Sequence, residues 1–236
     1  MKKIKKILIT GAAGLCGSVV YDGLIKKGYK IVSFDKKITP SNAAKKINLK
    51  ISKKIKKIDL KNFKSLTKIT KGIDGVIHLG GIPRHTPKED IYSKILDNNI
   101  SGTYNLFEAC RINKVKRIIF ASSAHVIGFH NRKKKIDEKC ILRPDSHYAV
   151  SKCFGEALAS LYSDKYNIKT MCIRIGSVLP KPTDERFLST WISFRDLVHL
   201  VDVGIQSPKL HCSVVYGISK NKRSWWKNNE AYKLGY

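Results

Sequence analysis

The chain has 236 residues, of which 42% are apolar, enough to bury one sizeable core and too few for two independent ones. We therefore expect one structural unit. The formal net charge is +28, and a positive potential of this kind attracts polyanions without regard to their sequence. However, the lysines are spread over many short runs without an aromatic RNA-binding signature, so the pattern favours a lysine-rich solvated surface over a nucleic-acid interface.

The cysteines and the N-terminal residues exclude other classes of protein. The 6 cysteines form no C-x-x-C pair, so we expect neither a metal site nor a disulfide framework. The opening MKKIKKILIT could begin a signal peptide, but Gly11 and Gly14 interrupt its apolar stretch, and Leu15 before Cys16 is not a small residue. No uncharged run reaches the ~18 residues of a membrane span. We expect a soluble, cytoplasmic protein.

Strand and helix patterns alternate along the chain. The strand patterns cover residues 4–10, 30–34, 55–58, 76–79, 117–121, 170–175 and 213–215, and the helical patterns cover 15–27, 89–112, 148–162 and 195–203. The alternation predicts an α/β fold, a Rossmann-type doubly wound parallel sheet, because right-handed crossovers place a helix between neighbouring parallel strands. We expect an NAD-binding domain over residues 1–176 and a small substrate-binding region over residues 177–236.

A glycine loop follows the first predicted strand. The sequence TGAAGLCG places Gly11, Gly14 and Gly17 between a strand and a helix that begins near Leu15. Glycines permit the close backbone approach that a pyrophosphate needs, and the helix N-terminus supplies free N–H groups. Asp35 ends the second strand, where a carboxylate accepts bonds from ribose hydroxyls and repels a 2′-phosphate. The loop and Asp35 together predict NAD as the cofactor.

A tyrosine and a lysine lie one helical turn apart just after the fifth long strand pattern. Tyr148 and Lys152 form Y-x-x-x-K, which places both side chains on one helix face. A phenol with a pKa near 10 is a poor base at neutral pH, so it needs a neighbouring cation. Ser123 ends the preceding strand. These three residues predict a catalytic site.

These motifs resemble those of the extended short-chain dehydrogenase/reductase (NAD-dependent epimerase/dehydratase) family, over nearly the whole chain. The later segments HLGGI, ASSAHVIGF, YAVSKCFGEALA, RIGSVLP, RFLSTW and VVYG are most similar to those of uronate dehydrogenases. The resemblance implies oxidation of the C1 hydroxyl of a hexuronate, such as galacturonate or glucuronate, to an aldarolactone with formation of NADH.

The resemblance also assigns roles to individual residues. Tyr148 would be the base, Lys152 would lower its pKa and hold the nicotinamide ribose, and Ser123 would orient the substrate hydroxyl. Further cofactor contacts are implied for Leu15, Asp59, Leu60, Leu79, Gly80, Gly81, Asn99 and Ile175. Substrate contacts are implied for His125, Ser177 and Arg186, with Arg186 on the carboxylate, which a planar guanidinium matches in a two-point bond.

Two departures from the family pattern concern the substrate. Ala124 stands where the family has an asparagine, and Pro83 stands where it has a serine. Each removes a hydrogen bond to the sugar, typically worth about 1 kcal/mol.

Two alternatives remain open, and the oligomer is an expectation drawn from relatives. One alternative is a nucleotide-sugar epimerase or dehydratase, which would keep Tyr148 and Lys152, although a dehydratase usually carries an Asp-Glu pair where this chain has Ala124 and His125. The other is a non-catalytic dinucleotide- or RNA-binding module. Relatives commonly dimerise through the helices that correspond here to residues 89–112 and 148–162, so we expect a homo-oligomer.

Overall fold

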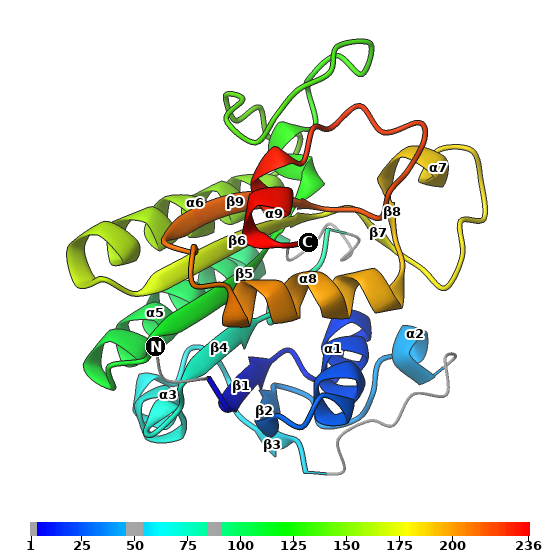
Figure 1. Ribbon diagram of the computed structural model, residues 1–236. Helices are drawn as coiled ribbons and strands as arrows, with labels where there is room; N and C mark the ends of the chain where they lie inside the picture. Colours follow the sequence, from blue (N-terminus) through cyan, green and yellow to red (C-terminus); the bar gives the residue numbers. More distant parts are fainter. Residues whose placement is uncertain (1–3, 46–53, 85–90) are drawn as a thin grey trace.

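A seven-stranded parallel sheet forms the centre of the molecule (Figure 1). The computed structural model describes residues 4–45, 54–84 and 91–236. The strand order is β3-β2-β1-β4-β5-β6-β9. The strands are β1 (Lys6–Thr10), β2 (Lys30–Asp35), β3 (Lys56–Lys57), β4 (Gly75–His78), β5 (Arg117–Ser123), β6 (Lys169–Ile175) and β9 (Cys212–Gly217). The predicted Rossmann-type doubly wound sheet is thereby confirmed.

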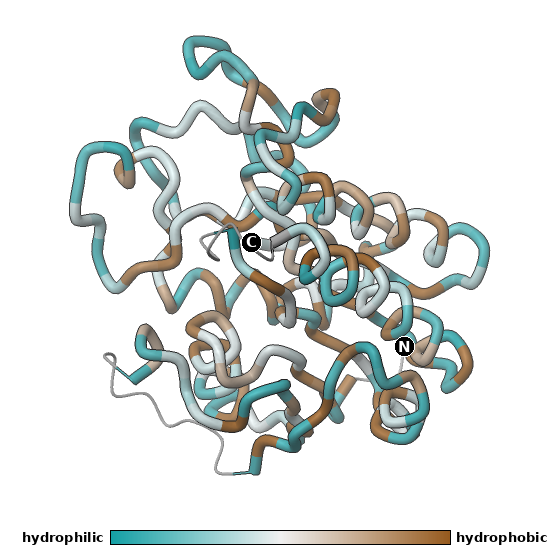
Figure 2. Tube along the Cα trace, turned by 180° about the vertical axis from the view of Figure 1, so that it is seen from behind, coloured by the Kyte–Doolittle hydropathy of each residue, from teal (hydrophilic) through white to brown (hydrophobic). Residues whose placement is uncertain are grey.

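Helices cover both faces of the sheet. On one face lie α1 (Leu15–Lys26) and α8 (Phe194–Gln206), with the short α2 (Asn42–Lys45) beside α1. On the other face lie α3 (Phe63–Thr70), α5 (Gly102–Ile112) and α6 (His147–Tyr166). The longer helices bury many of their apolar residues against the strands, and Figure 2 shows hydrophilic and hydrophobic stretches alternating along the helical turns. Two hydrophobic cores result, one on each face of the sheet.

The sheet reverses its direction of growth beside β1. β2 pairs with one edge of β1 and β4 with the other, so the connections from these strands run to opposite sides. In sheets of this type ligands bind beyond the carboxyl ends of the strands at this reversal. The glycine loop after β1 and the HLGG segment after β4 both lie there.

The helix predicted over residues 89–112 contains an irregular segment. Residues 89 and 90 lie outside the described part of the chain; from there the segment forms α4 (Ile91–Ile95), a π-helix (Leu96–Ser101) and then α5. A π-helical turn widens the backbone locally and is frequent at functional sites. This π-helix carries Asn99, one of the residues implied as a cofactor contact.

Several elements have no counterpart in the predictions. These are α2, α3, a 3₁₀ turn (Ala124–Ile127), the paired short strands β7 (Ser177–Val178) and β8 (Trp191–Ile192), α7 (Phe187–Thr190) and α9 (Asn229–Leu234). The division at residue 176 stays a prediction, and β9 from beyond it pairs with β6 in the same sheet. Within the described ranges, no helix is long and apolar enough to cross a membrane.

Candidate active site

The glycine loop packs against the HLGG segment with no room for side chains. Gly11 has φ +68°, and a Cβ on it would lie 2.6 Å from the backbone N of Gly80. A Cβ on Gly17 would lie 2.1 Å from the carbonyl oxygen of Gly11. Gly14 is the N-cap of α1 and has no side chain to bond the N–H groups of the first turn. The loop therefore needs glycine at Gly11 and Gly17 to pack this closely, and it leads into a helix N-terminus without a side-chain cap, a combination that suits a pyrophosphate.

The carboxylate of Asp35 is fixed at the end of β2. It accepts hydrogen bonds from the backbone N–H of Ala13 at 3.0 Å and of Lys37 at 3.3 Å. The neighbouring Lys36 forms an ion pair with Asp59 at 3.1 Å. Asp35 thus lies against the glycine loop, where its carboxylate can meet ribose hydroxyls. The acceptance of ribose by Asp35 and the roles of Asp59 and Leu60 stay predictions.

The pKa of Asp59 lies below its ordinary value. Burial raises this pKa, but the hydrogen bond from the N–H of Lys61 and the ion pair with Lys36 outweigh the burial. Asp59 therefore stays charged at neutral pH and keeps Lys36 engaged.

A buried hydrogen-bond network holds the HLGG segment in place. His78 is fully buried, bonds Thr10 through Nδ1 at 2.7 Å and Thr103 through Nε2 at 3.1 Å, and the N–H of Gly80 donates to Thr10 at 3.0 Å. Burial and the positive charge of Lys152 lower the pKa of His78 to about 3. His78 is therefore neutral and acts as scaffold beneath Gly80.

Asn99 connects the HLGG segment to the helix that carries the tyrosine. Its side-chain oxygen accepts from the N–H of Ile82 at 2.7 Å, and its amide donates to the carbonyl of Ile82 at 3.1 Å and to Ser151 at 3.2 Å. Ser151 in turn donates to the carbonyl of Tyr148 at 2.6 Å. Asn99 is only 2% exposed. The geometry gives Asn99 a positioning role here, and direct contact with a cofactor stays a prediction.

The structure brings the three predicted catalytic residues together. Ser123 lies at the end of β5 and Tyr148 at the start of α6, close enough for the Ser123 side chain to lower the pKa of the phenol. The ammonium nitrogen of Lys152 lies 5.6 Å from the centre of the Tyr148 ring and 5.0 Å from that of Phe120. A Cβ on Gly81 would lie 3.7 Å from this nitrogen, so Lys152 also borders the HLGG segment.

Burial shifts the pKa of both members of the Y-x-x-x-K pair. Burial raises the pKa of Tyr148, the hydrogen bond with Ser123 lowers it, and nearby Cys16 raises it. Burial lowers the pKa of Lys152 to about 8, against an opposing effect of Cys16. The activation of Tyr148 by Lys152 therefore stays a prediction, while their proximity is a fact of the structure. Cys16 was missed from the sequence, which gave no signal beyond its place in the glycine loop.

His125 belongs to a charged cluster beside Ser123. Its Nδ1 lies 2.7 Å from a carboxylate oxygen of Asp145, and its Nε2 lies 3.5 Å from a guanidinium nitrogen of Arg84. Its backbone N–H donates to the hydroxyl of Ser123 at 3.2 Å. Arg84 and Asp145 come from separate loops, and no motif in the sequence signalled them.

The remaining implied substrate residues lie on short elements after β6. The hydroxyl of Ser177 pairs with that of Thr190 at 3.1 Å, where β7 meets β8. Arg186 is exposed, and its guanidinium lies 4.8 Å from the ring centre of Phe187. Within the described ranges, no hydrogen bond or ion pair joins Arg186 to Ser123 or Tyr148. Its role stays a prediction.

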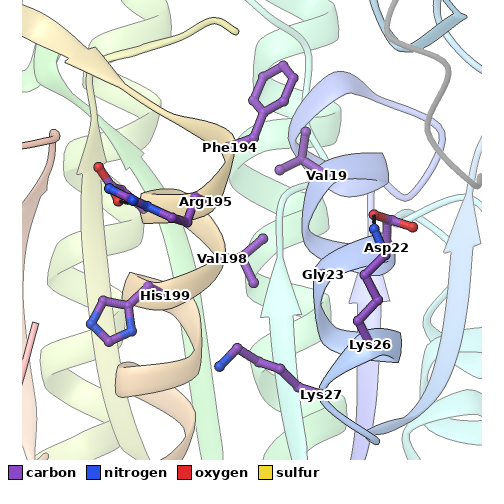
Figure 3. Close-up of a pocket in the computed structure, with 10 residues that line it drawn as sticks. Val19, Asp22, Gly23, Lys26, Lys27, Phe194, Arg195, Val198 and His199 are labelled. Carbon is purple, nitrogen blue, oxygen red and sulfur yellow. Dashed lines mark hydrogen bonds and ion pairs between the residues drawn. The ribbon is translucent and has the colours of Figure 1, made fainter.

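Two hollows of the described structure lie away from these residues. One, of about 670 Å³, lies between α1 and α8, with Val19 and Gly23 facing Phe194 and Val198 across it (Figure 3). The other, of about 380 Å³, lies at the opposite end of the sheet, near Arg117. We locate the site from the chemistry of its side chains, because the residues with complementary functions converge at the carboxyl ends of β1, β4 and β5. In the described part of the chain no cluster of residues suits a metal ion.

The fold and site define a nucleotide-binding protein with a Ser-Tyr-Lys constellation, and residues 7–203 match the model of the NAD dependent epimerase/dehydratase family. The chain belongs to this family.

Within this family, the chain is similar to several dehydrogenases that act on uronates. The chain is 41% identical to a uronate dehydrogenase of Pseudomonas putida over 98% of this chain and 82% of the relative. It is similar to the structure of a glucuronic acid dehydrogenase from Chromohalobacter salexigens, with 41% identity, a TM-score of 0.87 and coverage of 98% and 83% of the two chains. A uronate dehydrogenase mutant from Agrobacterium tumefaciens, solved with NAD, has 38% identity, a TM-score of 0.87 and coverage of 98% and 83%.

Proposed function

We propose that this protein is an NAD-dependent oxidoreductase that converts the C1 hydroxyl of a hexuronate to an aldarolactone and forms NADH. The observation that carries the proposal is the meeting of Ser123, Tyr148 and Lys152 near the glycine loop and the HLGG segment packed against it. Relatives named as uronate dehydrogenases, at 38–41% identity over nearly the whole chain, support the substrate class.

The residues around the glycine loop fit NAD. The loop leaves the backbone free to approach a pyrophosphate, and the carboxylate of Asp35 lies within hydrogen-bond distance of the loop N–H of Ala13. Lys152, which borders both Tyr148 and Gly81, would hold the nicotinamide ribose. NAD held by these residues would supply the acceptor for the hydride that leaves C1 of the substrate.

The protein residues handle the proton of the substrate hydroxyl. Ser123 orients this hydroxyl toward Tyr148, and Tyr148 accepts the proton as general base. A phenol in this site needs the positive charge of Lys152, because burial raises the pKa of Tyr148. The C1–H bond and the O–H bond on C1 thus break together: the hydride would pass from C1 to the nicotinamide, the hydroxyl proton would pass from the oxygen to Tyr148, and the C1–O bond would become a carbonyl.

Arg186 is our candidate for the substrate carboxylate. In the described part of the chain it has no ion-pair partner, so its guanidinium is available for a two-point bond. Arg186 lies on the segment between Pro180 and Trp191, which we propose closes over the sugar. Ser177 and His125 would form hydrogen bonds with the hydroxyl groups of the sugar.

The test is a substrate panel with NAD and absorbance at 340 nm. We expect NADH formation with galacturonate or glucuronate, weak formation with the neutral aldoses, and none with UDP-glucose. NADH formation with neutral aldoses alone, or epimerisation of the UDP-sugar without net NADH, would contradict the proposal.

We further propose a cytoplasmic homodimer that does not act on nucleic acid. The apolar side chains of Leu96 and Tyr104 on the helical segments after β4, and of Val150 and Leu161 on α6, are 49–56% exposed. Helical faces with exposed apolar side chains are suited to pairing with a second copy. The lysines are scattered along the chain, which argues against RNA binding. Retention of the protein on immobilised RNA, weakening steeply as salt is raised, would contradict the proposal that it does not act on nucleic acid.

A further inference from the structure

A buried ion pair lies beneath the catalytic residues. Glu156 is on α6, one helical turn after Lys152, and Arg174 is on β6. The guanidinium donates to both carboxylate oxygens of Glu156, from Nε at 3.0 Å and from Nη2 at 2.9 Å. The side chains of Arg174 and Glu156 are 3% and 7% exposed. The pair is therefore bidentate and shielded from water.

The same carboxylate holds the catalytic strand. The hydroxyl of Ser122 donates to Glu156 at 2.6 Å, and Ser122 is 2% exposed. Ser122 directly precedes Ser123, so Glu156 joins the end of β5, which carries Ser123, to α6, which carries Tyr148 and Lys152. The hydrogen bond between Ser122 and Glu156 is therefore made by the residue next to Ser123 in the chain.

Arg174 extends the connection toward a loop beside the site. Its Nη1 donates to the carbonyl of Glu138 at 3.2 Å, and its guanidinium lies 5.7 Å from the ring centre of Tyr216. The bidentate bond fixes the orientation of Glu156, because rotation of the carboxylate would break two bonds at once. In the described residues no hydrogen bond joins Glu156 to Lys152, so Arg174 satisfies the charge of Glu156 and leaves Lys152 to Tyr148 and the cofactor.

Buried ion pairs are weak sources of net stability, because desolvation of the two charges offsets their attraction, and apolar replacements are often neutral. The contact with Ser122 points to a different role. We propose that Glu156, oriented by Arg174, is a positioning residue that fixes Ser123 against Tyr148 through Ser122. This inference rests on the catalytic roles in the proposed function. A displacement near 1 Å in such a site can lower turnover by about 10²-fold.

Two variants separate positioning from stability. Ser122→Ala removes only the bond to Glu156, and the double variant Glu156→Leu with Arg174→Met replaces the ion pair with apolar side chains of similar length. The matched control is Ser163→Ala, which removes another buried serine hydroxyl of the same unit, bonded to the carbonyl of His211 at 2.9 Å.

The readouts are kcat with galacturonate, KM for NAD, thermal stability and the titration of Tyr148. We expect kcat to fall about 10-fold in Ser122→Ala and 10- to 100-fold in the double variant, with KM for NAD changed less than about twofold. Ser163→Ala should lose stability and keep its kcat. The double variant should keep a low kcat even where its melting temperature equals that of the unmodified protein.

The titration needs no substrate and therefore tests the inference apart from the proposed function. The phenolate absorbance of each variant is measured as the difference from the same variant carrying Tyr148→Phe. If Glu156 positions Ser123, the pKa of Tyr148 rises in both variants, because the Ser123 side chain that lowers this pKa is no longer held close to the phenol. An unchanged Tyr148 pKa in both variants would overturn the inference; absence of uronate oxidation in the unmodified protein would overturn only the proposed function.

Discussion

The cofactor side and the substrate side of the candidate site are built in different ways. On the cofactor side, Gly11, Asp35 and Asn99 are held by backbone contacts or by buried hydrogen bonds. On the substrate side, Ser177 lies on the two-residue strand β7, and Arg186 is the exposed residue that precedes the four-residue helix α7. A rigid cofactor platform with a looser substrate segment allows one fold to accept different sugars, because specificity is carried by loops on a fixed scaffold.

The largest expected effect is the loss of turnover in Tyr148→Phe, which tests the chemical step apart from cofactor binding and substrate binding. Tyr148→Phe should lower kcat by about 10²- to 10⁴-fold, because it removes the general base. NAD affinity, measured by calorimetry, should stay within about threefold, since the glycine loop and Asp35 hold the dinucleotide. Tyr232→Phe, at an exposed position on α9, is the control and should behave like the unmodified protein. Turnover near normal in Tyr148→Phe would refute the mechanism.

Arg186 tests the substrate side. Arg186→Ala should raise KM for a uronate by a factor that corresponds to about 2–5 kcal/mol if the bound pair is desolvated. The rate with the matching neutral aldose should change little, because that sugar has no carboxylate. Arg223→Ala, which removes the partner of Glu185 in the same region, is the control. Equal losses with both sugars would show that Arg186 supports the segment instead of reading the carboxylate.

Lys152 tests whether the site lowers the stability of the fold. The pKa of Lys152 is about 8 in the folded protein, below its ordinary value, so the unfolded chain binds more protons between that pH and about 10.5. The penalty is therefore fully present below pH 8 and fades as the pH rises. Lys152→Met should inactivate the protein and raise its unfolding free energy at pH 7 by up to about 3 kcal/mol. Lys165→Met, at an exposed position of α6, should neither inactivate the protein nor raise its unfolding free energy. Equal melting temperatures for the two variants would contradict a burial penalty at Lys152.

Two glycines test the tight packing of the cofactor side. A Cβ on Gly17 would lie 2.1 Å from the carbonyl oxygen of Gly11, whereas one on Gly14 would lie 3.3 Å from it. Gly17→Ala should therefore cost about 1–3 kcal/mol of stability and weaken NAD binding. Gly14→Ala, the matched control, should be much milder. Similar melting temperatures and NAD affinities in both variants would show that the loop is more adaptable than its geometry indicates.

The smallest expected effect concerns the choice between NAD and NADP. Asp35 should repel a 2′-phosphate, and the ion pair of Lys36 with Asp59 should keep that lysine from binding one. We expect kcat/KM to favour NAD by about tenfold or more, and Asp35→Ser to narrow the ratio by several-fold. Comparable kcat/KM values for both cofactors in the unmodified protein would contradict the assignment.

Periodicity and glycine spacing predicted the sheet, the order of its elements and the meeting of Ser123, Tyr148 and Lys152, because these follow from local pattern and from the right-handed connection of parallel strands. The helix α3 was missed because its residues are largely polar, although Asn62 caps it and Leu66 is buried. The π-helical turn is set by tertiary packing, which leaves no periodic signal.

Contacts between distant loops were also beyond the sequence. Arg84, His125 and Asp145 meet only in the folded chain. The spacing of Lys152 and Glu156 was misleading in another way, because a glutamate four residues after a lysine is typical of an exposed helical ion pair. The structure instead buries Glu156 against Arg174 and Ser122. Burial and the choice of partner are tertiary properties, so the motif YAVSKCFGE alone could not show that its glutamate holds the catalytic strand.

The most direct test of the account is the fate of the C1 carbon. Galacturonate labelled with ¹³C at C1 is incubated with the protein and NAD, and the reaction is followed by NMR together with absorbance at 340 nm. We predict that the anomeric signal is replaced by a lactone carbonyl signal in step with NADH, one for one. An anomeric signal that stays unchanged with no NADH, or that moves to an epimeric sugar, would contradict the assignment of this site to uronate oxidation.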